Sequence, residues 1–279
     1  MAGQSHGEWA MTESPELSVA RRAATAGALI AARYFADLSL AEIETKRSDT
    51  GYQGLVTRAD TDAETAIIDI IRAQFPNHQF MAEEGFSHEV SAEHLWIIDP
   101  IDGTNNFAHG IPHYAVSVAY YQNGIAQCGC IIHPEAKDEF VCQRGRGATH
   151  NGKLVAVNRH SALDQTMLAV GFYYDRDRMM RATLDAIEDC FRQQIQGIRR
   201  MGSAALDIVQ VGLGRFGGFF EYQLAPWDFA AARLFLEEAG GKITTCLGHE
   251  LPLAKTSVLA TNGRLHEPLL DIVRRHATY

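Results

Sequence analysis

The sequence predicts an α/β protein in which helices pack in layers against β-sheets. Segments with helical periodicity alternate with short apolar segments in both halves of the chain, which is typical of layered α/β packing. The dipeptide Asn123-Gly124 stands between two apolar runs and predicts a β-hairpin. The chain has 279 residues, of which 46% are hydrophobic, and it shows no internal repeat. We therefore expect one domain over residues 15–279, with two subdomains near 15–157 and 158–279.

The first predicted helix follows a recognisable start signal. Ser14 is a favourable N-cap residue and Pro15 is suited to the first helical position, so we predict a helix from Leu17 to Asp37. Its apolar face would contain Val19, Ala23, Ala26, Ile30 and Tyr34. Residues 1–14, which precede the apolar pattern, are predicted to be disordered.

The second helix is predicted from a capping box at residues 61–64, where the hydroxyl of Thr61 and the carboxylate of Glu64 would bind end N–H groups. Residues 39–56 before it are polar and mixed, and we expect a loop or an irregular strand there. The other predicted strands are 79–82, 95–99, 113–122, 125–132, 139–142, 154–157, 167–170, 217–221, 242–245 and 257–260. The other predicted helices are 178–194, 203–211, 229–239 and 265–276.

Composition argues against two classes of partner. The net charge is −9 and no basic stripe is visible, so we expect no direct binding of nucleic acid. No apolar run reaches the roughly 18 residues that a membrane span needs, so we expect no membrane interaction. The five cysteines form no CxxC pair, and the N-terminus lacks the apolar core of a signal peptide. Reduced thiols and a cytoplasmic location are the expectation.

Carboxylates stand at the ends of predicted elements and are candidates for a metal site. Glu83, with Glu84, follows the strand QFMA; Asp99 and Asp102 follow LWII; and Asp228 opens a helix. Oxygen ligands of this kind suit Mg²⁺, Mn²⁺ or Ca²⁺, and no His/Cys cluster with zinc spacing competes. Taken singly, each has a simpler explanation: a turn for the DPID aspartates, a solvated pair for the glutamates and an N-cap for Asp228. Spacing alone does not show that these residues converge.

Gly103 and Thr104 follow the aspartates and add a possible anion site. A glycine lets a ligand approach the backbone, and free N–H groups would point at an anion if a helix begins here. Carboxylates, divalent cations and such N–H groups together indicate metal-assisted hydrolysis of a phosphoester. His109 and His113 lie nearest this motif, and a structural or solvent-facing position is favoured over metal binding for both.

These residues resemble the inositol monophosphatase family of Mg²⁺-dependent, lithium-sensitive phosphatases, and in particular its bacterial inositol-1-monophosphatases. The resemblance rests on the glutamate pair, on WIIDPIDGTNNF and on PWDFAAARLFLEEAGG, and it extends from about Leu17 to the C-terminus. It implies the layered α/β/α/β/α sandwich of the inositol monophosphatase and fructose-bisphosphatase type, usually as a homodimer. Ala82, where the family usually has glycine, and Gly54, where it often has an acid, depart from the pattern.

The resemblance also implies a role for each motif residue. Two or three Mg²⁺ ions, or Mn²⁺ in their place, would be bound by Glu83, Asp99, the carbonyl of Ile101, Asp102 and Asp228. Thr104 and Glu83 would orient and deprotonate a metal-bound water for in-line attack, and Asp60 would hydrogen-bond Thr104. The remaining substrate contacts would come from backbone N–H groups of Gly103 and Thr104, from Gly202, Ser203 and Ala204, and from Glu221, which would bind ring hydroxyls.

The expected substrate is a small phosphorylated polyol, with inositol-1-phosphate as the first choice. The DPIDGT form of the motif resembles both inositol monophosphatases and histidinol-phosphate phosphatases. Glu221 favours a polyol, although a carboxylate could also bind the ammonium of histidinol phosphate, and a solvated strand-end charge is the simpler explanation. A further alternative is a non-catalytic role in binding transcription machinery, because some bacterial members of the family have one.

Overall fold

The computed structural model describes residues 13–48, 51–85 and 92–277. Its helices are α1 (Pro15–Ala36), α2 (Arg58–Gln74), α3 (Thr104–Ala108), α4 (Arg178–Arg192), α5 (Ala204–Gly212), α6 (Pro226–Glu238) and α7 (His266–His276). Its strands are β1 (Glu44–Ser48), β2 (Gly51–Val56), β3 (Gln79–Ala82), β4 (His94–Asp102), β5 (Ala115–Gln122), β6 (Ile125–His133), β7 (Asp138–Gln143), β8 (Gly147–His150), β9 (Lys153–Leu154), β10 (Met167–Val170), β11 (Gly197–Arg199), β12 (Gly218–Leu224), β13 (Lys242–Thr244) and β14 (Thr256–Thr261).

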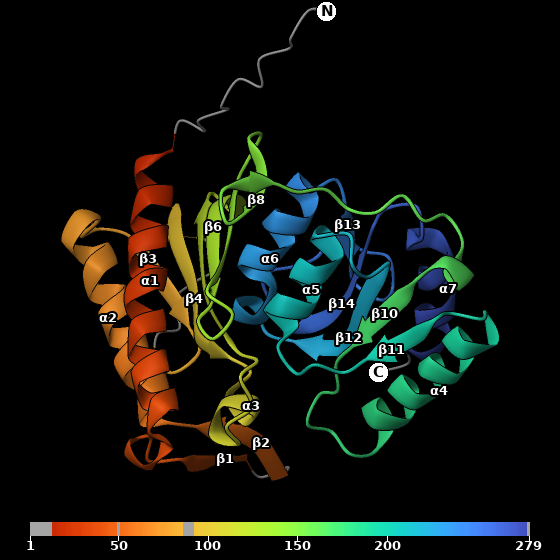
Figure 1. Cartoon of the computed structure of the whole chain (residues 1–279), viewed down its shortest axis with the longest axis horizontal. Coiled ribbons are helices and arrows are strands. Elements are labelled where there is room, and N and C mark those ends of the chain that lie inside the picture. Colours follow the sequence, from red (N-terminus) through yellow and green to blue (C-terminus); the bar gives the residue numbers. More distant parts are fainter. Residues whose placement is uncertain (1–12, 49–50, 86–91, 278–279) are drawn as a thin grey trace, which may run out of the picture.

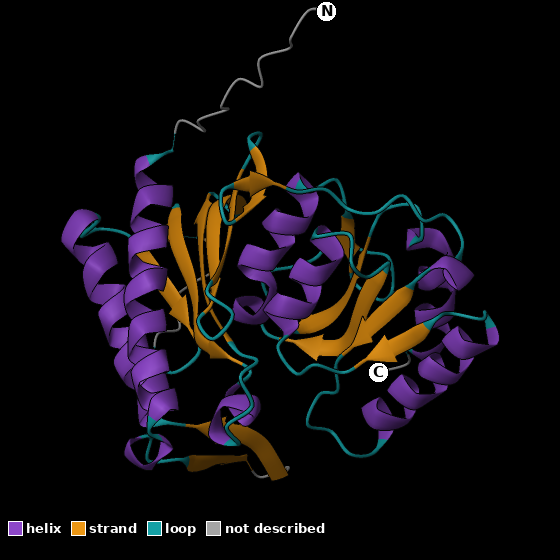
Figure 2. Ribbon diagram, in the orientation of Figure 1, coloured by secondary structure: helices purple, strands orange, loops and turns teal. Residues whose placement is uncertain are grey.

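The elements form five layers, which confirms the predicted α/β/α/β/α sandwich (Figure 1; Figure 2). Helices α1 and α2 cover a seven-stranded sheet, α5 and α6 fill the space between this sheet and a five-stranded one, and α4 and α7 cover the outer face of the five-stranded sheet (Figure 1). The larger sheet has the order β3-β4-β5-β6-β7-β8-β9, in which only β3 and β4 are parallel. The smaller sheet has the order β11-β10-β12-β14-β13, and β10 is parallel to both of its neighbours.

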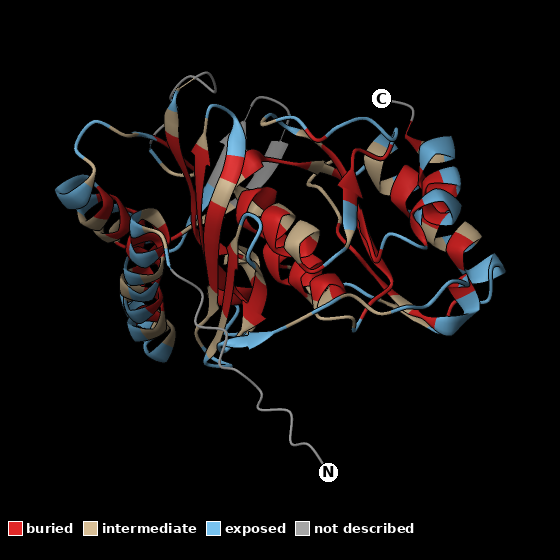
Figure 3. Ribbon diagram, turned by 90° about the horizontal axis from the view of Figure 1, so that it is seen from above, coloured by how far each residue is buried: buried red, intermediate tan, exposed pale blue. Residues whose placement is uncertain are grey.

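Apolar cores lie between the layers, and strand β4 contributes side chains to two of them. Its side chains alternate between the faces of the sheet. Trp96 and Ile98 enter the core under α1 and α2, whereas Leu95 and Ile97 enter the central core around α5 and α6. Figure 3 shows buried residues along the strands and along the helices between the sheets. Because both faces of this strand are covered, its run LWII is apolar throughout.

Local signals predicted several boundaries well. The hydroxyl of Ser14 accepts a hydrogen bond from Leu17 N at 3.1 Å, so the predicted N-cap of α1 is confirmed. Asn123 and Gly124 both have positive φ, 51° and 74°, and they join β5 to β6 as the predicted hairpin. Most of residues 1–14, the segment predicted to be disordered, lie outside the described residues, which begin at Glu13.

The predicted start of α2 is wrong. The helix begins at Arg58, and its capping box is made by Thr57 and Asp60, not by residues 61–64. Asp60 Oδ2 accepts hydrogen bonds from Thr57 N at 2.8 Å and from the Thr57 hydroxyl at 2.6 Å. Glu64 instead accepts a hydrogen bond from Glu84 N at 2.8 Å. An aspartate at the third helical position can cap a helix as a glutamate does; both acids are buried, and it is Asp60 that bonds back to Thr57.

Other differences are small. Residues 39–56 contain the two strands β1 and β2, which pair as a separate antiparallel hairpin. The strand predicted at 154–157 ends at Leu154, and the short edge strand β11 was not predicted. All five cysteines lie in the described part of the chain, and each is a buried free thiol. Among the described residues, no helix is both long enough and apolar enough to cross a membrane. The division into subdomains near residue 157 stays a prediction, although the two sheets are built from residues on either side of it.

Candidate metal and phosphate site

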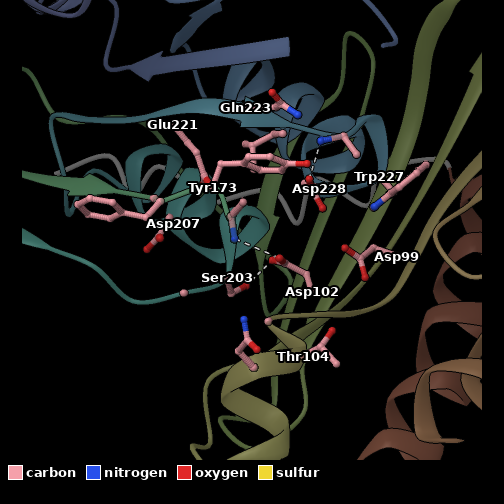
Figure 4. A pocket seen from close by; sticks show the side chains of 18 of the residues that line it. Asp99, Asp102, Thr104, Tyr173, Ser203, Asp207, Glu221, Gln223, Trp227 and Asp228 are labelled. Atoms are coloured by element: carbon pink, nitrogen blue, oxygen red, sulfur yellow. Dashed lines mark hydrogen bonds between the residues drawn. The ribbon is translucent and has the colours of Figure 1, made fainter. Parts of the chain in front are cut away.

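Three of the predicted carboxylates converge in space. Asp99 and Asp102 lie at the end of β4, and Asp228 lies in the first turn of α6, which packs between the sheets. One carboxylate oxygen from each of the three lies within 4.8 Å of the other two (Figure 4). The pairing of β4 with β5 is irregular between Asp99 and Asp102, where the chain passes Pro100. This irregularity breaks the alternation of the strand and lets both aspartates face the same point.

The electrostatics of this cluster fit a divalent cation. Burial raises the pKa of Asp99 well above its usual value, and the charges of Glu83, Asp102 and Asp228 raise it further. Burial, followed by the charge of Glu83, likewise raises the pKa of Asp228. A fold that buries carboxylates together without a cation destabilises their charged forms, and a bound divalent cation reverses this effect. The donor set is all oxygen, as Mg²⁺ and Mn²⁺ prefer.

Glu83 reaches the cluster from the neighbouring strand. It directly follows β3, and β3 pairs in parallel with β4 so that Ala82 lies opposite Ile98. Glu83 is therefore the counterpart of Asp99 on the adjacent strand, and both residues line the same cavity. Glu84 does not line this cavity, and its backbone N–H binds Glu64 instead. The structure thus separates the two glutamates that are adjacent in the sequence.

The backbone next to Asp102 opens a short helix. Gly103 has a φ of +100° and is the N-cap of α3, which begins at Thr104. A Cβ at residue 103 would lie 3.1 Å from the carbonyl oxygen of Gly202 and 3.2 Å from that of His113. Both the backbone conformation and the lack of space therefore require glycine at this position.

The hydroxyl of Thr104 lies close to two acceptor oxygens. It donates a hydrogen bond to the carbonyl oxygen of Ile101 at 3.0 Å and lies 3.4 Å from Asp60 Oδ1. Asp60 is completely buried, and burial is the main reason why its pKa rises to about 7, with the charges of Glu83 and Glu84 contributing. The Ile101 carbonyl has a second lone pair, so the contact with Thr104 leaves it able to bind a cation.

Asp102 also anchors the helix that carries the predicted substrate contacts. The Ser203 hydroxyl donates a hydrogen bond to Asp102 Oδ2, Ala205 N donates to the same oxygen at 2.8 Å, and Ala204 N donates to Oδ1 at 3.1 Å. Burial raises the pKa of Asp102 to about 6, and these hydrogen bonds oppose the rise. The negative charge is therefore placed at the N-terminus of α5, where free N–H groups and the helix dipole favour it.

These elements surround a cavity of about 360 Å³. Glu221, on β12, lines it and is only 8% exposed, so the explanation as a solvated strand-end charge is wrong. Burial raises the pKa of Glu221 to about 8, and the nearby charge of Arg200 opposes the rise. The side chain packs against Gly171, where an added Cβ would lie 1.7 Å from Glu221 Oε2. Gly202, Ser203 and Ala204 line the same cavity, and their contact with substrate stays a prediction.

Several lining residues were missed by the sequence analysis. They are Asn105, Gly171, Phe172, Tyr173, Tyr174, Arg200, Asp207, Gln223, Leu224, Ala225, Trp227 and Lys255. Asp207 alone carried a local signal, because it is an acid within a helix whose other residues are almost all apolar and buried. His109 and His113 do not line the cavity.

The sequence model of the inositol monophosphatase family matches residues 13–278. The chain belongs to the inositol monophosphatase family. Among its relatives is the Nus factor SuhB of Pseudomonas aeruginosa, 36% identical over 94% of this chain and 97% of the relative. The inositol-1-monophosphatase of Synechocystis is 38% identical over 77% of this chain and 75% of the relative. The solved structure of inositol monophosphatase from Anabaena has a TM-score of 0.79, with 35% identity over 93% of this chain and 95% of that one. The fold and the family are therefore those that the motifs indicated.

Proposed function

We propose that this family member is a Mg²⁺-dependent phosphomonoesterase that hydrolyses inositol-1-phosphate to inositol and phosphate. The observation that supports this most strongly is one cavity that contains the carboxylate cluster, the Thr104 hydroxyl and the buried carboxyl of Glu221. The first would hold cations, the second would position water, and the third would recognise the sugar-like part of the substrate.

The metal ligands would be Glu83, Asp99, Asp102, Asp228 and the carbonyl of Ile101. Two or three Mg²⁺ ions are expected, with Mn²⁺ as a substitute, because the donors are carboxylate and carbonyl oxygens. When bound, such ions would offset the charge of the substrate phosphate, lower the pKa of water and stabilise the leaving alkoxide.

The chain itself would orient the attacking water and receive its proton. The Thr104 hydroxyl donates its one proton either to the Ile101 carbonyl or to Asp60, so its lone pairs are free to accept a hydrogen bond from water. Glu83 lines the cavity and its charge acts on Asp99, and it would serve as the general base that the resemblance to the family implies. All five cysteines are buried, and the Ser203 hydroxyl is bound to Asp102, which supports direct attack by water over a covalent intermediate. Gly103 and Thr104 would bind the phosphate through their backbone N–H groups.

The substrate assignment rests on Glu221 and on the relatives. A buried carboxyl that lines the cavity can bind adjacent hydroxyls, and one relative carries the name inositol-1-monophosphatase. Histidinol phosphate is the second choice, because its ammonium could bind the same carboxyl. We expect phosphate release with Mg²⁺ to be at least about tenfold more efficient, in kcat/KM, for inositol-1-phosphate than for histidinol phosphate, 3′-phosphoadenosine 5′-phosphate or fructose-1,6-bisphosphate. Lithium inhibition can be measured in the same assay, with Asp99→Asn as the blank.

A second role is favoured by a specific observation: several similar proteins, including the one from Pseudomonas aeruginosa, carry the name Nus factor SuhB. We infer that this chain could also bind proteins of the transcription machinery, independently of catalysis. Co-elution of the purified chain with transcription factors, retained in the Asp99→Asn variant, would support this role. If neither the wild-type chain nor the Asp99→Asn variant co-elutes with transcription factors, this second role is excluded. A homodimer and a cytoplasmic location remain expectations, and sedimentation velocity of the purified chain tests the first.

A further inference from the structure

Asp207 is a buried acid that lines the cavity, and one of its carboxylate oxygens has no hydrogen-bond partner among the described residues. It is 1% exposed, and its Oδ1 atom has no hydrogen-bond partner within the part of the chain that the structure describes. Buried polar atoms are almost always paired in native proteins, because an unpaired one destabilises the fold. An unpaired buried oxygen that lines a cavity is therefore a candidate for binding a ligand.

The position of Asp207 on its helix directs it to the substrate side of the cavity. Residues four positions apart lie on the same face of a helix, so Asp207 shares the face of Ser203. Ser203 is bound to Asp102 at the N-terminus of α5, and both Ser203 and Asp207 line the cavity. In Figure 4 Asp207 and Glu221 lie on the same side of Ser203, away from Asp99.

Arg200 connects the two acids electrostatically and limits what they can bind. Its guanidinium lies beside Gly202, where an added Cβ would be 2.4 Å from Nη1, and its charge acts on both Asp207 and Glu221. Burial raises the pKa of Asp207 well above its usual value, as it does for Glu221. A protonated carboxyl both donates and accepts a hydrogen bond, which is what a hydroxyl also does. An ammonium would meet the positive charge of Arg200, so neutral hydroxyls fit this end of the cavity better.

We propose that Asp207 is a second hydroxyl-binding residue, which together with Glu221 recognises the polyol part of the substrate at the end of the cavity away from Asp99. This inference rests on the proposed function, since it presupposes a polyol monophosphate. Asp207 acts on specificity and has no contact with the reacting phosphate. It determines how the ring is oriented while the carboxylate cluster holds the phosphate.

The test compares two substrates in variants of one residue. Asp207→Ala removes both hydrogen-bonding oxygens, whereas Asp207→Asn keeps the shape together with one donor group and one acceptor. Gln210→Ala is the matched control, because residue 210 lies on the same helix and does not line the cavity. KM and kcat are measured with saturating Mg²⁺ for inositol-1-phosphate and for phenyl phosphate, which lacks ring hydroxyls, and thermal unfolding reports the fold.

We expect Asp207→Ala to raise KM for inositol-1-phosphate by about tenfold, with kcat within a few-fold and KM for phenyl phosphate nearly unchanged. Asp207→Asn should retain most of the wild-type KM, and Gln210→Ala should change neither substrate. The unfolding temperature of Asp207→Ala should not fall, because no hydrogen bond of Oδ1 within the fold is lost. A purely structural role would instead lower it and affect both substrates equally.

The outcomes separate the two proposals. Equal changes in KM for both substrates, or an unchanged KM for inositol-1-phosphate, would overturn the role of Asp207 while leaving the phosphatase assignment intact. Wild-type protein that releases phosphate from phenyl phosphate and not from inositol-1-phosphate would overturn the proposed substrate, and with it the inference. A selective rise in KM that Asp207→Asn avoids would support both.

Discussion

Replacing Asp99 by asparagine should separate the stability of the metal-free protein from its metal affinity. Asp99 is buried, and its carboxylate lies within 4.8 Å of oxygens of Asp102 and Asp228. At an effective dielectric constant of about 20, two unit charges at the 4.8 Å limit repel by about 3.5 kcal/mol. Burial, together with this repulsion, raises the pKa of Asp99, so the metal-free fold destabilises its charged form relative to the neutral acid. Asparagine resembles that neutral form, so metal-free Asp99→Asn should unfold at the wild-type temperature or above it.

The metal-loaded protein should respond in the opposite direction. A divalent cation interacts with a carboxylate about twice as strongly as a single charge does, and asparagine removes that attraction. We expect Mg²⁺ affinity to fall by at least about a hundredfold, and kcat/KM with inositol-1-phosphate to fall by more. Differential scanning fluorimetry with and without Mg²⁺ gives the first quantity, and phosphate release gives the second.

A matched substitution controls for the loss of one negative charge. Asp69→Asn makes the same chemical change on the exposed face of α2, outside the cavity, and should leave both measurements unchanged. The reasoning is refuted if Asp99→Asn keeps activity within a few-fold and still gains the wild-type stabilisation from Mg²⁺. It is also refuted if the metal-free variant unfolds several degrees below wild type.

Two further residues give predictions with signs fixed by the structure. Glu221→Gln should raise KM for inositol-1-phosphate more than for phenyl phosphate, and equal effects would exclude ring recognition. The pKa of Glu221 rises from 4.5 to about 8 on folding, so the native state binds the proton more tightly and the free energy of unfolding should fall between these pH values. In the Glu221→Gln variant the free energy of unfolding should therefore depend less on pH over this range. Chemical denaturation at several pH values measures that free energy. Gly171→Ala should displace Glu221, lower stability by about 1–3 kcal/mol and reduce selectivity for inositol-1-phosphate; unchanged kinetics would show that the displacement does not matter.

The elements predicted well from the sequence depend on contacts within a few residues. The N-cap of α1 and the Asn-Gly hairpin are of this kind, because the residues that decide them are adjacent. The start of α2 failed for a different reason. Both Thr57–Asp60 and Thr61–Glu64 have the pattern of a capping box, and only tertiary structure, which buries Asp60 beneath Thr104, selects the first.

The arrangement of the site also depends on contacts between residues that are far apart in the sequence. The oxygens of Asp99 and Asp228 come together although the two residues lie in different halves of the chain, and no local pattern predicts such a contact. Resemblance to the family supplied that step. The structure then added what the motifs do not show: Gly171 leaves the space that Glu221 fills, and Asp207 joins it in the cavity.

Asp102 links the larger sheet, the metal site and helix α5 through its two carboxylate oxygens. It ends a strand of the larger sheet, and it accepts hydrogen bonds from Ser203, Ala204 and Ala205 at the start of a helix that packs against β12 of the smaller one. A cation bound by Asp102 would draw on the same two oxygens that hold this helix. Asp207 lies one turn further along the helix. Any shift at Asp102 would therefore also move the Asp207 carboxyl, which we propose binds hydroxyls of the substrate. Metal binding and substrate recognition are therefore expected to be coupled through α5, and Mg²⁺ should lower the dissociation constant of inositol-1-phosphate more in the wild type than in Asp207→Ala.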